Sequence, residues 1–328
     1  MKKITIIGGS GFVGTNLCHY LHLNKVVFEI IDLKMSNKFP QYCKIGDVRI
    51  LEDLRQAITG DIVIDLAAIH RDDVANRNEY YRTNVEGAKN ITKVCNEKKI
   101  LKIIFFSSVA VYGFALDRTD ESGNINPFND YGISKYEAEE IYRKFYLNIN
   151  TSLTIIRPTV IFGEGNRGNV YNLFNQIASR RLIMIGSGKN KKSMAYICNV
   201  VAFVDECIRD QNKYTVFNYV DTPDLDMNTL IKRVRRILFK KDNVGIRLPY
   251  CFGLLIGYTF DLFSKLLRKN LLVSSIRVKK FCCSSEFASS KYQLNNFIPP
   301  YSLLEGVEKT LKNEFINPDP NREIFYTE

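Results

Sequence analysis

A glycine-rich segment near the start of the chain constrains the fold more than any other feature. The segment reads GGSGFVG from Gly8 to Gly14 and follows Lys3–Ile7, a run typical of a buried strand. Residues Phe12–Leu23 then have the apolar spacing of a helix. The three evenly spaced glycines permit a tight turn and let a pyrophosphate approach the backbone closely. This strand–turn–helix unit predicts a dinucleotide site at the start of the helix, where Phe12 and Val13 lie.

An acidic residue follows the second expected strand. The run Phe28–Ile31 ends at Asp32, about 20 residues after the turn begins, where an acid accepts hydrogen bonds from the adenosine ribose hydroxyls. A carboxylate in this place repels a 2′-phosphate, so NAD is favoured over NADP. The alternative is an aspartate that merely ends a strand, and the preceding turn argues against it.

Strands and helices alternate along the first half of the chain. We expect strands at Asp61–Leu66, which leads into Ala67-Ala68, and at Lys102–Phe106, with a helix over Asn78–Lys98 between them. This alternation predicts an α/β fold with a doubly wound parallel sheet of the Rossmann type, which binds ligands at the carboxyl ends of its strands. We place the dinucleotide-binding domain at residues 1–160, with later elements returning to it, and a smaller C-terminal substrate lobe at residues 161–328.

Hydroxyl groups and a Tyr–Lys pair follow, placed for proton and hydride transfer. Ser107 and Ser108 come directly after the strand that ends at Phe106. Tyr131 and Lys135 open an expected helix and are four residues apart, so they share one helical face. An ammonium group beside a phenol lowers the pKa of the phenol, which makes Tyr131 a general base near neutral pH. Ser108 would hold the substrate oxygen that loses its proton. The alternative is an ordinary surface pair of Tyr and Lys.

Composition and charge exclude several classes of protein. Eight scattered cysteines without a CxxC pair are typical of a reduced, cytosolic protein, and three histidines are too few for a zinc site, so no metal is expected. The first apolar run is too short for a signal sequence.

The excess of positive charge lies in one segment of the chain. Ile231–Lys280 holds 13 of the 46 basic residues and two of the 35 acidic residues, so this segment alone accounts for the net charge of +11. This favours an anionic partner; without interleaved aromatic residues, nucleic acid is not expected.

These pieces together resemble a known family, the extended short-chain dehydrogenase/reductases (NAD-dependent epimerases and dehydratases) that modify nucleotide-activated sugars. The matching pieces are the Gly8/Gly11/Gly14 turn, Asp32, Gly46-Asp47-Val48, Ala67-Ala68, Thr83-Asn84-Val85 with Gly87, Ser107-Ser108 with Val111-Tyr112-Gly113, Tyr131 with Lys135, and Arg157-Pro158. The resemblance covers nearly the whole chain. It implies a catalytic set of Ser108, Tyr131 and Lys135. It also implies NAD as cofactor, held by Gly8, Gly11, Phe12, Val13, Gly14, Asp32, Asp47, Val48, Leu66, Ala67, Ala68, Asn84, Tyr131, Lys135 and Pro158.

The two residues after Ser108 indicate which reaction of the family applies. Family dehydratases carry an acid pair there and decarboxylases carry a Glu, whereas this chain has Val109-Ala110. By resemblance, elimination and decarboxylation are disfavoured. Oxidation at C4 of a sugar followed by reduction on the opposite face remains. We therefore expect an isomerase, an NAD-dependent sugar 4-epimerase in which Tyr131 removes and returns the O4 proton.

The second half of the chain indicates a diphosphate-linked N-acetylhexosamine as substrate. By resemblance, Asn169, Lys192 and Arg277 bind the diphosphate and Ser108 contacts the sugar; from the residues alone, Lys192 fits a solvated turn equally well. Family members that exclude N-acetyl sugars carry a bulky Tyr near position 284, where this chain has the small residues Cys282–Ser285. Asn199 stands where the family usually has Asp, and we expect a structural role for it.

Four stretches resemble one subgroup more closely, the bacterial 4-epimerases of undecaprenyl-diphosphate-linked N-acetylglucosamine. They are Arg71–Val74, Arg157–Leu173, Lys192–Tyr196 and Ser275–Cys282. Members of this subgroup convert the lipid-linked GlcNAc to GalNAc at the start of O-antigen synthesis. The resemblance therefore implies a lipid-linked substrate and a role in lipopolysaccharide synthesis.

The apolar stretch Leu248–Leu267 is compatible with a lipid-linked substrate. It carries aromatic residues and is accompanied by Lys265, Arg268 and Lys269, a combination that suits peripheral contact with an anionic membrane surface. A buried core helix of the smaller lobe explains the spacing equally well. We expect a cytoplasmic protein, peripheral on the inner face of the cytoplasmic membrane, and leave a homodimer open.

Two other functions remain open. A soluble UDP-GlcNAc or UDP-glucose 4-epimerase would use the same catalytic residues and differ in its substrate. A non-catalytic regulator that binds NAD is the second, although such proteins usually lose the Tyr or the Lys and this chain keeps both. Asp32 disfavours a third function, an NADP-linked ketosugar reductase.

Overall fold

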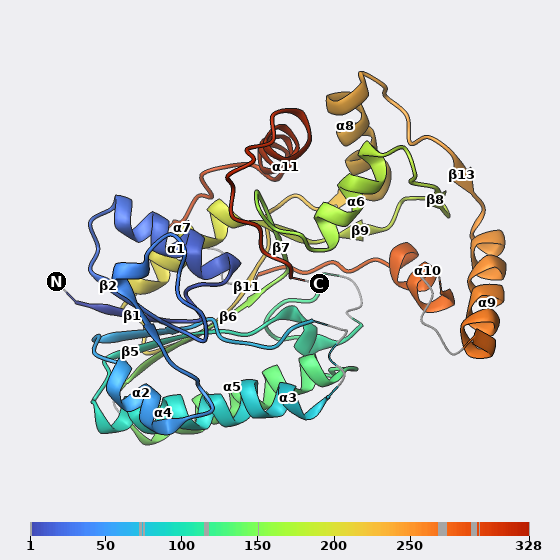
Figure 1. The fold of residues 1–328 in the computed structure, drawn as a ribbon. Coiled ribbons are helices and arrows are strands. Elements are labelled where there is room, and N and C mark those ends of the chain that lie inside the picture. The colour runs from blue at the N-terminus through green and yellow to red at the C-terminus, as the bar shows by residue number, and fades with distance from the viewer. Residues whose placement is uncertain are drawn as a thin grey trace.

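A computed structural model describes residues 2–71, 74, 76–114, 118–149, 151–267, 274–289, 294 and 296–327. Asp72, Asp73, Arg268 and Lys269 therefore lie outside the described residues. Seven parallel strands form the central sheet in the order β11-β6-β5-β4-β1-β2-β3, with helices on both faces (Figure 1). The doubly wound parallel sheet expected from the sequence is confirmed.

The strands are buried on both faces because their alternate residues enter two different cores. Ile6 packs with the helices of one face, whereas Ile7 packs with those of the other, and both are essentially inaccessible to solvent. The strands of the sheet are β1 (Ile4–Ile7), β2 (Phe28–Asp32), β3 (Cys43–Ile45), β4 (Ile62–Asp65), β5 (Lys102–Phe106), β6 (Ser152–Pro158) and β11 (Tyr214–Tyr219). One face is covered by α1 (Phe12–Leu23) and α7 (Ile197–Arg209), the other by α2 (Leu51–Ala57), α4 (Gly87–Glu97) and α5 (Asp130–Asn148).

The single helix expected over Asn78–Lys98 is interrupted. It consists of α3 (Asn78–Tyr80), a π-helical segment η2 (Tyr81–Glu86) and α4. Where the segments meet, Gly87 packs against Val48; a Cβ on Gly87 would lie 2.9 Å from Val48 Cγ2. The π-helical segment, whose turns are wider than those of an α-helix, thus ends where the helix contacts the loop that carries Val48. Helical periodicity in the sequence does not predict this contact.

The remaining elements build a smaller lobe above the carboxyl ends of the strands (Figure 1). They are β7 (Val160–Phe162), α6 (Asn169–Ala178), β8 (Met184–Ile185), β9 (Lys191–Lys192), β10 (Met194–Tyr196), β12 (Leu225–Asp226), α8 (Met227–Phe239), β13 (Arg247–Leu248), α9 (Tyr250–Leu267), α10 (Ser275–Cys282), α11 (Leu303–Leu311) and the π-helical segment η4 (Lys312–Ile316). Two short 3-10 helices, η1 (Pro40–Tyr42) and η3 (Val109–Tyr112), belong to the sheet domain. The elements that return to the sheet domain are α7 and β11. Side chains of α1, α6, α8 and α11 share one hydrophobic cluster, so the core continues from one lobe into the other.

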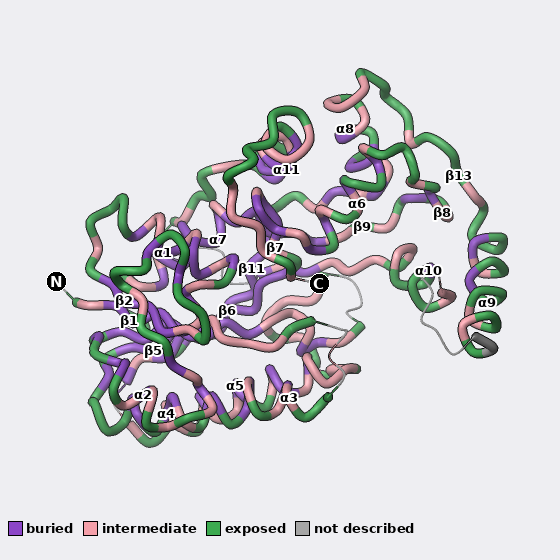
Figure 2. The backbone as a smooth tube through the Cα atoms, viewed as in Figure 1, coloured by how far each residue is buried: buried purple, intermediate pink, exposed green. Residues whose placement is uncertain are grey.

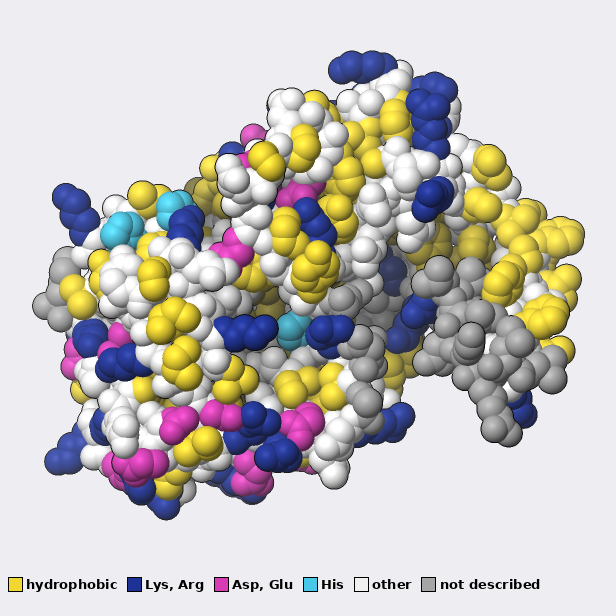
Figure 3. All heavy atoms as spheres, viewed as in Figure 1, with side chains coloured by type: hydrophobic (Ala, Val, Ile, Leu, Met, Phe, Trp, Pro, Cys, Tyr) yellow, Lys and Arg dark blue, Asp and Glu magenta, His cyan; other side chains and the backbone are white. Residues whose placement is uncertain are grey.

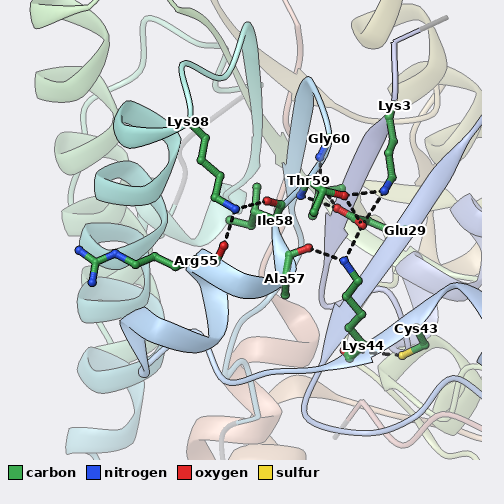
Figure 4. Close-up of polar contacts among 11 residues, drawn as sticks. Lys3, Glu29, Cys43, Lys44, Arg55, Ala57, Ile58, Thr59, Gly60 and Lys98 are labelled. Carbon is green, nitrogen blue, oxygen red and sulfur yellow. Dashed lines mark hydrogen bonds and ion pairs between the residues drawn. The ribbon is translucent and has the colours of Figure 1, made fainter.

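A polar network closes the amino end of the sheet, away from the expected ligand edge (Figure 4). Glu29 accepts hydrogen bonds from the Thr5 hydroxyl at 2.6 Å and the Thr59 amide at 2.7 Å, and its other oxygen binds Lys3 and Lys44 at 2.9 and 3.1 Å. Burial alone would raise the pKa of Glu29, but the hydrogen bonds from Thr5, Lys3 and Thr59 lower it to about 2. The ionised carboxylate thus links β1, β2 and the loop before β4 through hydrogen bonds and ion pairs.

Helix α9 packs at the far end of the smaller lobe, beside α10 (Figure 1). Its outward side is exposed along most of its length (Figure 2). Within the described residues, neither α9 nor any other helix is long and apolar enough to cross a membrane.

Candidate active site

The glycine-rich turn lies at the carboxyl end of β1, as predicted. Gly8 donates its amide hydrogen to the Ile31 carbonyl at 2.8 Å and has a positive φ of 79°. A Cβ on Gly14 would lie 2.5 Å from the Gly8 carbonyl oxygen, so only glycine lets α1 begin this close to β1. A Cβ on Gly11 would meet only that same oxygen, at 3.4 Å. The turn is therefore closed on its inner side and open beside Gly11.

The residues around this turn fit a dinucleotide. Gly11 is the N-cap of α1, and no side chain caps the helix, so the first amide groups of α1 suit an anion such as a pyrophosphate. Asp32 is held at the end of β2 because its carboxylate accepts hydrogen bonds from the Ser10 amide at 2.9 Å and the Lys34 amide at 3.3 Å. Beside the carboxyl end of β5, the Ser107 hydroxyl is buried and has no hydrogen-bond partner among the described residues.

The residues predicted to surround the adenine and the middle of the cofactor follow β3 and β4, except for Pro158, which ends β6. The Asp47 carboxylate binds Arg49, with its Oδ2 2.6 Å from NH2, and this hydrogen bonding lowers the pKa of Asp47. Leu66 and Ala67 follow β4, where the Leu66 amide hydrogen bonds to the Ile7 carbonyl at 2.9 Å. The contacts of Asp47, Val48, Leu66, Ala67, Ala68 and Pro158 with a cofactor stay predictions.

Asn84 ties together two parts of the site. Its amide oxygen accepts a hydrogen bond from the Ile69 amide at 2.9 Å, and its amide nitrogen donates to the Ile69 carbonyl at 3.1 Å and the Ser134 hydroxyl at 2.9 Å. Asn84 thus fixes the loop after β4 against α5. A direct contact of Asn84 with the cofactor stays a prediction.

Ser108 and Tyr131 meet at the carboxyl edge of the sheet. Ser108 is the N-cap of η3, and its hydroxyl accepts a hydrogen bond from the Ala110 amide at 3.1 Å. Asn129 caps α5 by accepting a hydrogen bond from the Gly132 amide at 2.9 Å, and the helix begins at Asp130. Tyr131 is hydrogen-bonded to the Ser108 side chain. The first turn of α5 therefore presents its phenol to the serine at the end of β5.

Gly132 makes this approach of α5 to η3 possible, and sequence reasoning did not single it out. A Cβ on Gly132 would lie 2.6 Å from the Ala110 carbonyl oxygen and 3.0 Å from Pro127. The signal was available, because a glycine inside the first turn of a helix is unfavourable unless close packing requires it.

Lys135 lies in a buried and charged environment. The side chain is 2% exposed, and its Nζ lies 4.3 Å from the centroid of the Phe105 ring. Burial lowers the pKa of Lys135 to about 8, while Asp65 and Glu139 act in the opposite direction. Neither acid was singled out from the sequence. The proximity of Asp65 depends on the packing of α5 against β4, whereas Glu139 is four residues after Lys135 on the same helix, a spacing that the sequence does show.

The pKa of Tyr131 differs from the sequence-based expectation. We expected the Lys135 ammonium to lower it, but burial raises the pKa of Tyr131 above its usual value and only the Ser108 hydrogen bond opposes this effect. Burial favours the neutral phenol, which carries no charge into the low-dielectric site. The expectation of a phenol activated by Lys135 alone is therefore wrong for this structure.

The structure brings Lys192 next to α10 and to the segment that follows it. Its Nζ donates to the Lys280 carbonyl at 2.9 Å, and β9 bridges to Ser285. Burial lowers the pKa of Lys192, whereas the nearby Cys283 and Cys282 act in the opposite direction. Arg277 is exposed on α10, and Asn169 is exposed at the first turn of α6. Diphosphate binding by these three residues stays a prediction.

Asn199 is structural, as expected. It is fully buried and pairs with the Tyr301 backbone, donating to the carbonyl at 2.8 Å and accepting from the amide at 3.0 Å. Arg71 lies next to the undescribed Asp72 and Asp73, so the subgroup stretch Arg71–Val74 is described only in part.

The fold and this constellation define a dinucleotide-dependent enzyme of the short-chain dehydrogenase type. The profile of the NAD-dependent epimerase/dehydratase family matches residues 4–219, and the chain belongs to this family. NAD is the family's cofactor, and the turn, the uncapped α1 and Asp32 are compatible with it.

Related proteins include several sugar epimerases. The chain is 46% identical over 99% of both chains to the N-acetyl-α-D-glucosaminyl-diphospho-ditrans,octacis-undecaprenol 4-epimerase of Escherichia coli O157:H7. It is 27% identical to the UDP-glucose 4-epimerase of Vibrio cholerae, over 94% of both chains. Among solved structures, the UDP-N-acetylglucosamine 4-epimerase of Methanobrevibacter ruminantium M1 superimposes with a TM-score of 0.76 at 20% identity, covering 97% of this chain and 99% of that one. This last similarity concerns the fold.

Proposed function

We propose that this protein is a 4-epimerase that converts N-acetylglucosamine to N-acetylgalactosamine while the sugar is linked through a diphosphate to undecaprenol, in the synthesis of a surface polysaccharide. The observation that carries the proposal is the 46% identity to a lipid-linked 4-epimerase over 99% of both chains. The Ser108–Tyr131 contact and the buried Lys135 supply the parts that such chemistry needs.

The side chains suggest how a proton is moved. Bound NAD would supply the acceptor and donor of the C4 hydride, and the glycine turn, the start of α1 and Asp32 are the residues that would hold it. Tyr131 takes the proton of the O4 hydroxyl as the C4–H bond breaks, leaving a 4-keto sugar, and gives the proton back in the second half of the reaction. Ser108 holds the oxygen through its hydroxyl. For this step Tyr131 acts as the phenolate, and the Ser108 hydrogen bond opposes the effect of burial on its pKa.

The same edge of the sheet disfavours the other reactions of the family. Val109 and Ala110 begin η3 directly after Ser108. Neither side chain can donate or accept a proton, so the general acid and base that elimination of water requires are absent from these two positions. A reaction limited to transfer of one hydride and one proton needs only the residues already described.

The direct test compares the two carriers. Purified protein is given lipid-linked GlcNAc and UDP-GlcNAc separately, and the galacto epimer is measured by chromatography. We expect conversion of the lipid-linked sugar and little conversion of the nucleotide sugar. The reverse preference would contradict the lipid carrier and favour a soluble UDP-sugar 4-epimerase. The Tyr131→Phe variant should lose at least about 100-fold in turnover because it lacks the proton acceptor, yet keep its NAD; full activity would contradict the catalytic role.

The second part of the proposal is that α9 binds the surface of an anionic membrane, on the cytoplasmic side. Among the residues of α9 whose burial is described, the buried positions are two glycines, so the inner side carries small residues: a Cβ on Gly253 would lie 2.5 Å from Ile185, and a Cβ on Gly257 would lie 2.7 Å from Ser275 Cα. Asp261 accepts a hydrogen bond from the Ser275 amide at 3.2 Å. This pattern is the reverse of a helix that packs on a protein core.

The outward side of α9 carries the large apolar side chains. Between 38% and 60% of each is exposed; they are Tyr250, Phe252, Leu255, Ile256, Tyr258, Phe260, Leu262 and Phe263. Figure 3 shows hydrophobic side chains gathered over α9, at the right of the view. A buried core helix, the alternative left open by the sequence, does not agree with these exposures. An exposed apolar patch of this size is typical of a surface that enters a membrane or contacts a protein.

The charges around α9 favour the membrane as the occupant. Four basic side chains are exposed on α9 and α10: Lys265, Arg277, Lys279 and Lys280. Within the residue ranges of these two helices, Asp261 is the only acidic residue. Lys279 lies 5.5 Å from the Tyr258 ring, at the border of the apolar side. Each basic residue near an anionic bilayer adds about 1 kcal/mol of attraction.

Flotation with vesicles tests this surface. The full chain should float with phosphatidylglycerol-containing vesicles and less with neutral ones. A Leu255→Ser/Phe263→Ser variant should lose most of its binding because about 1.5–3 kcal/mol is lost per apolar side chain. Leu147→Ser, on the exposed end of α5 (77% exposed), is the matched control. Equal flotation of all three proteins would contradict the proposal. Light scattering gives a second test: if the wild-type protein is a dimer and only the α9 variant is a monomer, the apolar side of α9 is a contact between two copies of the chain and not a membrane surface.

A further inference from the structure

The segment Glu323–Thr327 lies across the site between the two lobes (Figure 1). Two hydrogen bonds pair it with the loop that precedes α6: the Phe325 amide donates to the Gly165 carbonyl at 2.9 Å, and the Arg167 amide donates to the Phe325 carbonyl at 2.8 Å. The Thr327 hydroxyl donates to the Asn166 side chain at 2.5 Å. The segment is thus joined, like an added strand, to the loop that leads into α6 at Asn169.

This loop is shaped for the segment. Gly165 has a φ of 88°, and a Cβ there would lie 2.7 Å from the Glu323 carbonyl oxygen. A Cβ on Gly168 would lie 2.6 Å from the Thr327 hydroxyl. Both glycines therefore make room for the segment.

On its other side, the segment contacts the loops that surround the dinucleotide site. The Phe325 ring packs on the ring of Phe12, the first residue of α1, with centroids 5.7 Å apart. Glu323 accepts a hydrogen bond from the Asn37 side chain at 2.7 Å, in the loop that follows Asp32. The start of α1 and the loop after β2 thus both contact this one short segment.

We infer that Glu323–Thr327 is a strap that retains the dinucleotide, with Phe325 and Glu323 as its positioning residues. The strap joins the glycine-turn helix and the loop after β2 to the loop ahead of Asn169. By holding these elements together, the strap slows release of the dinucleotide. The inference rests on the cofactor of the family and not on the identity of the sugar.

The strap has an internal control. Phe325 is half-buried against the main core, whereas the neighbouring Tyr326 is 74% exposed. Successive side chains of an extended segment point to opposite sides, so one aromatic residue contacts Phe12 and the next does not. Phe325→Ala and Tyr326→Ala remove similar side chains from adjacent positions.

Release of NAD from the purified, loaded protein tests the inference. The protein is diluted, and the NAD that remains bound is measured over time by rapid filtration and chromatography. We expect Phe325→Ala to release NAD about three- to tenfold faster, which corresponds to the loss of one aromatic pair. Tyr326→Ala should release NAD at the wild-type rate, and a chain ending after Asn321 should release it faster than Phe325→Ala.

A second variant guards against a folding defect. Glu323→Gln weakens the exposed contact with Asn37 and leaves the core untouched, so it should accelerate release even if Phe325→Ala fails to fold. Wild-type release rates in both Glu323→Gln and the shortened chain would overturn the inference. Because sugar is absent from the measurement, this result would leave the proposed 4-epimerase reaction unaffected.

Discussion

Glu139 binds Arg157 with both carboxylate oxygens. Nε of Arg157 lies 2.8 Å from Oε1, and NH2 lies 2.5 Å from Oε2, with side-chain exposures of 0% for Glu139 and 2% for Arg157. Arg157 also donates to the Tyr112 hydroxyl at 2.6 Å, and that hydroxyl donates to Asn218 at 2.8 Å. One buried chain of bonds thus links α5, which carries Tyr131 and Lys135, to β6, η3 and β11.

Glu139→Gln should destabilise the protein strongly. The substitution removes the charge that compensates a buried guanidinium, and breaking such a pair costs about 3–5 kcal/mol. Urea unfolding followed by circular dichroism measures the loss. The neighbouring Glu140, which pairs with Arg143 at 3.0 Å on the surface, is the control, and Glu140→Gln should cost less than about 1 kcal/mol. Similar losses in the two variants would contradict the importance of the buried pair.

Asp65→Asn should lower the pKa of Lys135 below its value of about 8. Burial depresses this pKa, and Asp65 is the first of two acids that oppose the effect. The Tyr142 hydroxyl, which donates to Asp65 at 2.8 Å, can still donate to an asparagine. The titration of Lys135 followed by NMR of its side chain measures the shift, and an unchanged midpoint would contradict the assigned interaction.

The same shift gives stability a definite dependence on pH. Unfolded Lys135 keeps its proton up to about pH 10.4, whereas the folded state loses it above about pH 8. Between these values the unfolded state binds more protons, so the Lys135 contribution to the free energy of unfolding increases with pH. In Asp65→Asn the increase should begin at a lower pH.

Local patterns predicted the elements that depend on local sequence. The helix Phe12–Leu23 and the strand Lys102–Phe106 were predicted to the residue, because apolar periodicity and the glycine turn fix them. The shared helical face of Tyr131 and Lys135 and the place of Ser108 after β5 also follow from local sequence. These features need no information from distant parts of the chain.

The rest of the site depends on contacts between residues far apart in sequence. Tyr112 and Asn218 are 106 residues apart, and no pattern in either segment points to the other. The pKa of Tyr131 was mispredicted because the cost of burial depends on three-dimensional packing. The side of α9 that faces solvent was also undetermined, because an apolar run has the same spacing in a core helix and on a membrane surface.

Glu29→Gln should change the response of the protein to acid. The folded pKa of Glu29 is about 2, below the value of about 4.3 in an unfolded chain. Its stabilising contribution, on the order of 2–3 kcal/mol, is complete above about pH 4.3 and disappears as the pH falls towards 2. The difference in free energy of unfolding between wild type and variant should therefore shrink over this range. Glu86→Gln, at an exposed pair with Lys89, should show a difference near zero throughout.

Two glycines of the same turn should respond differently to alanine. In Gly14→Ala the new Cβ would lie 2.5 Å from both Gly8 O and Gly9 Cα, so the turn must open and stability should fall by about 1–3 kcal/mol. In Gly11→Ala the nearest atom is 3.4 Å away, and the fold should lose less than about 1 kcal/mol. The Cβ added by Gly11→Ala would instead occupy the open side of the turn, where a pyrophosphate approaches the uncapped helix. Thermal unfolding without added NAD separates the effect on the fold from the effect on NAD binding.

Calorimetric titration with NAD should then show at least about tenfold weaker binding for Gly11→Ala. Wild-type affinity in Gly11→Ala would place the pyrophosphate elsewhere, whereas a large fall in its melting temperature would show that Gly11, like Gly14, serves the fold.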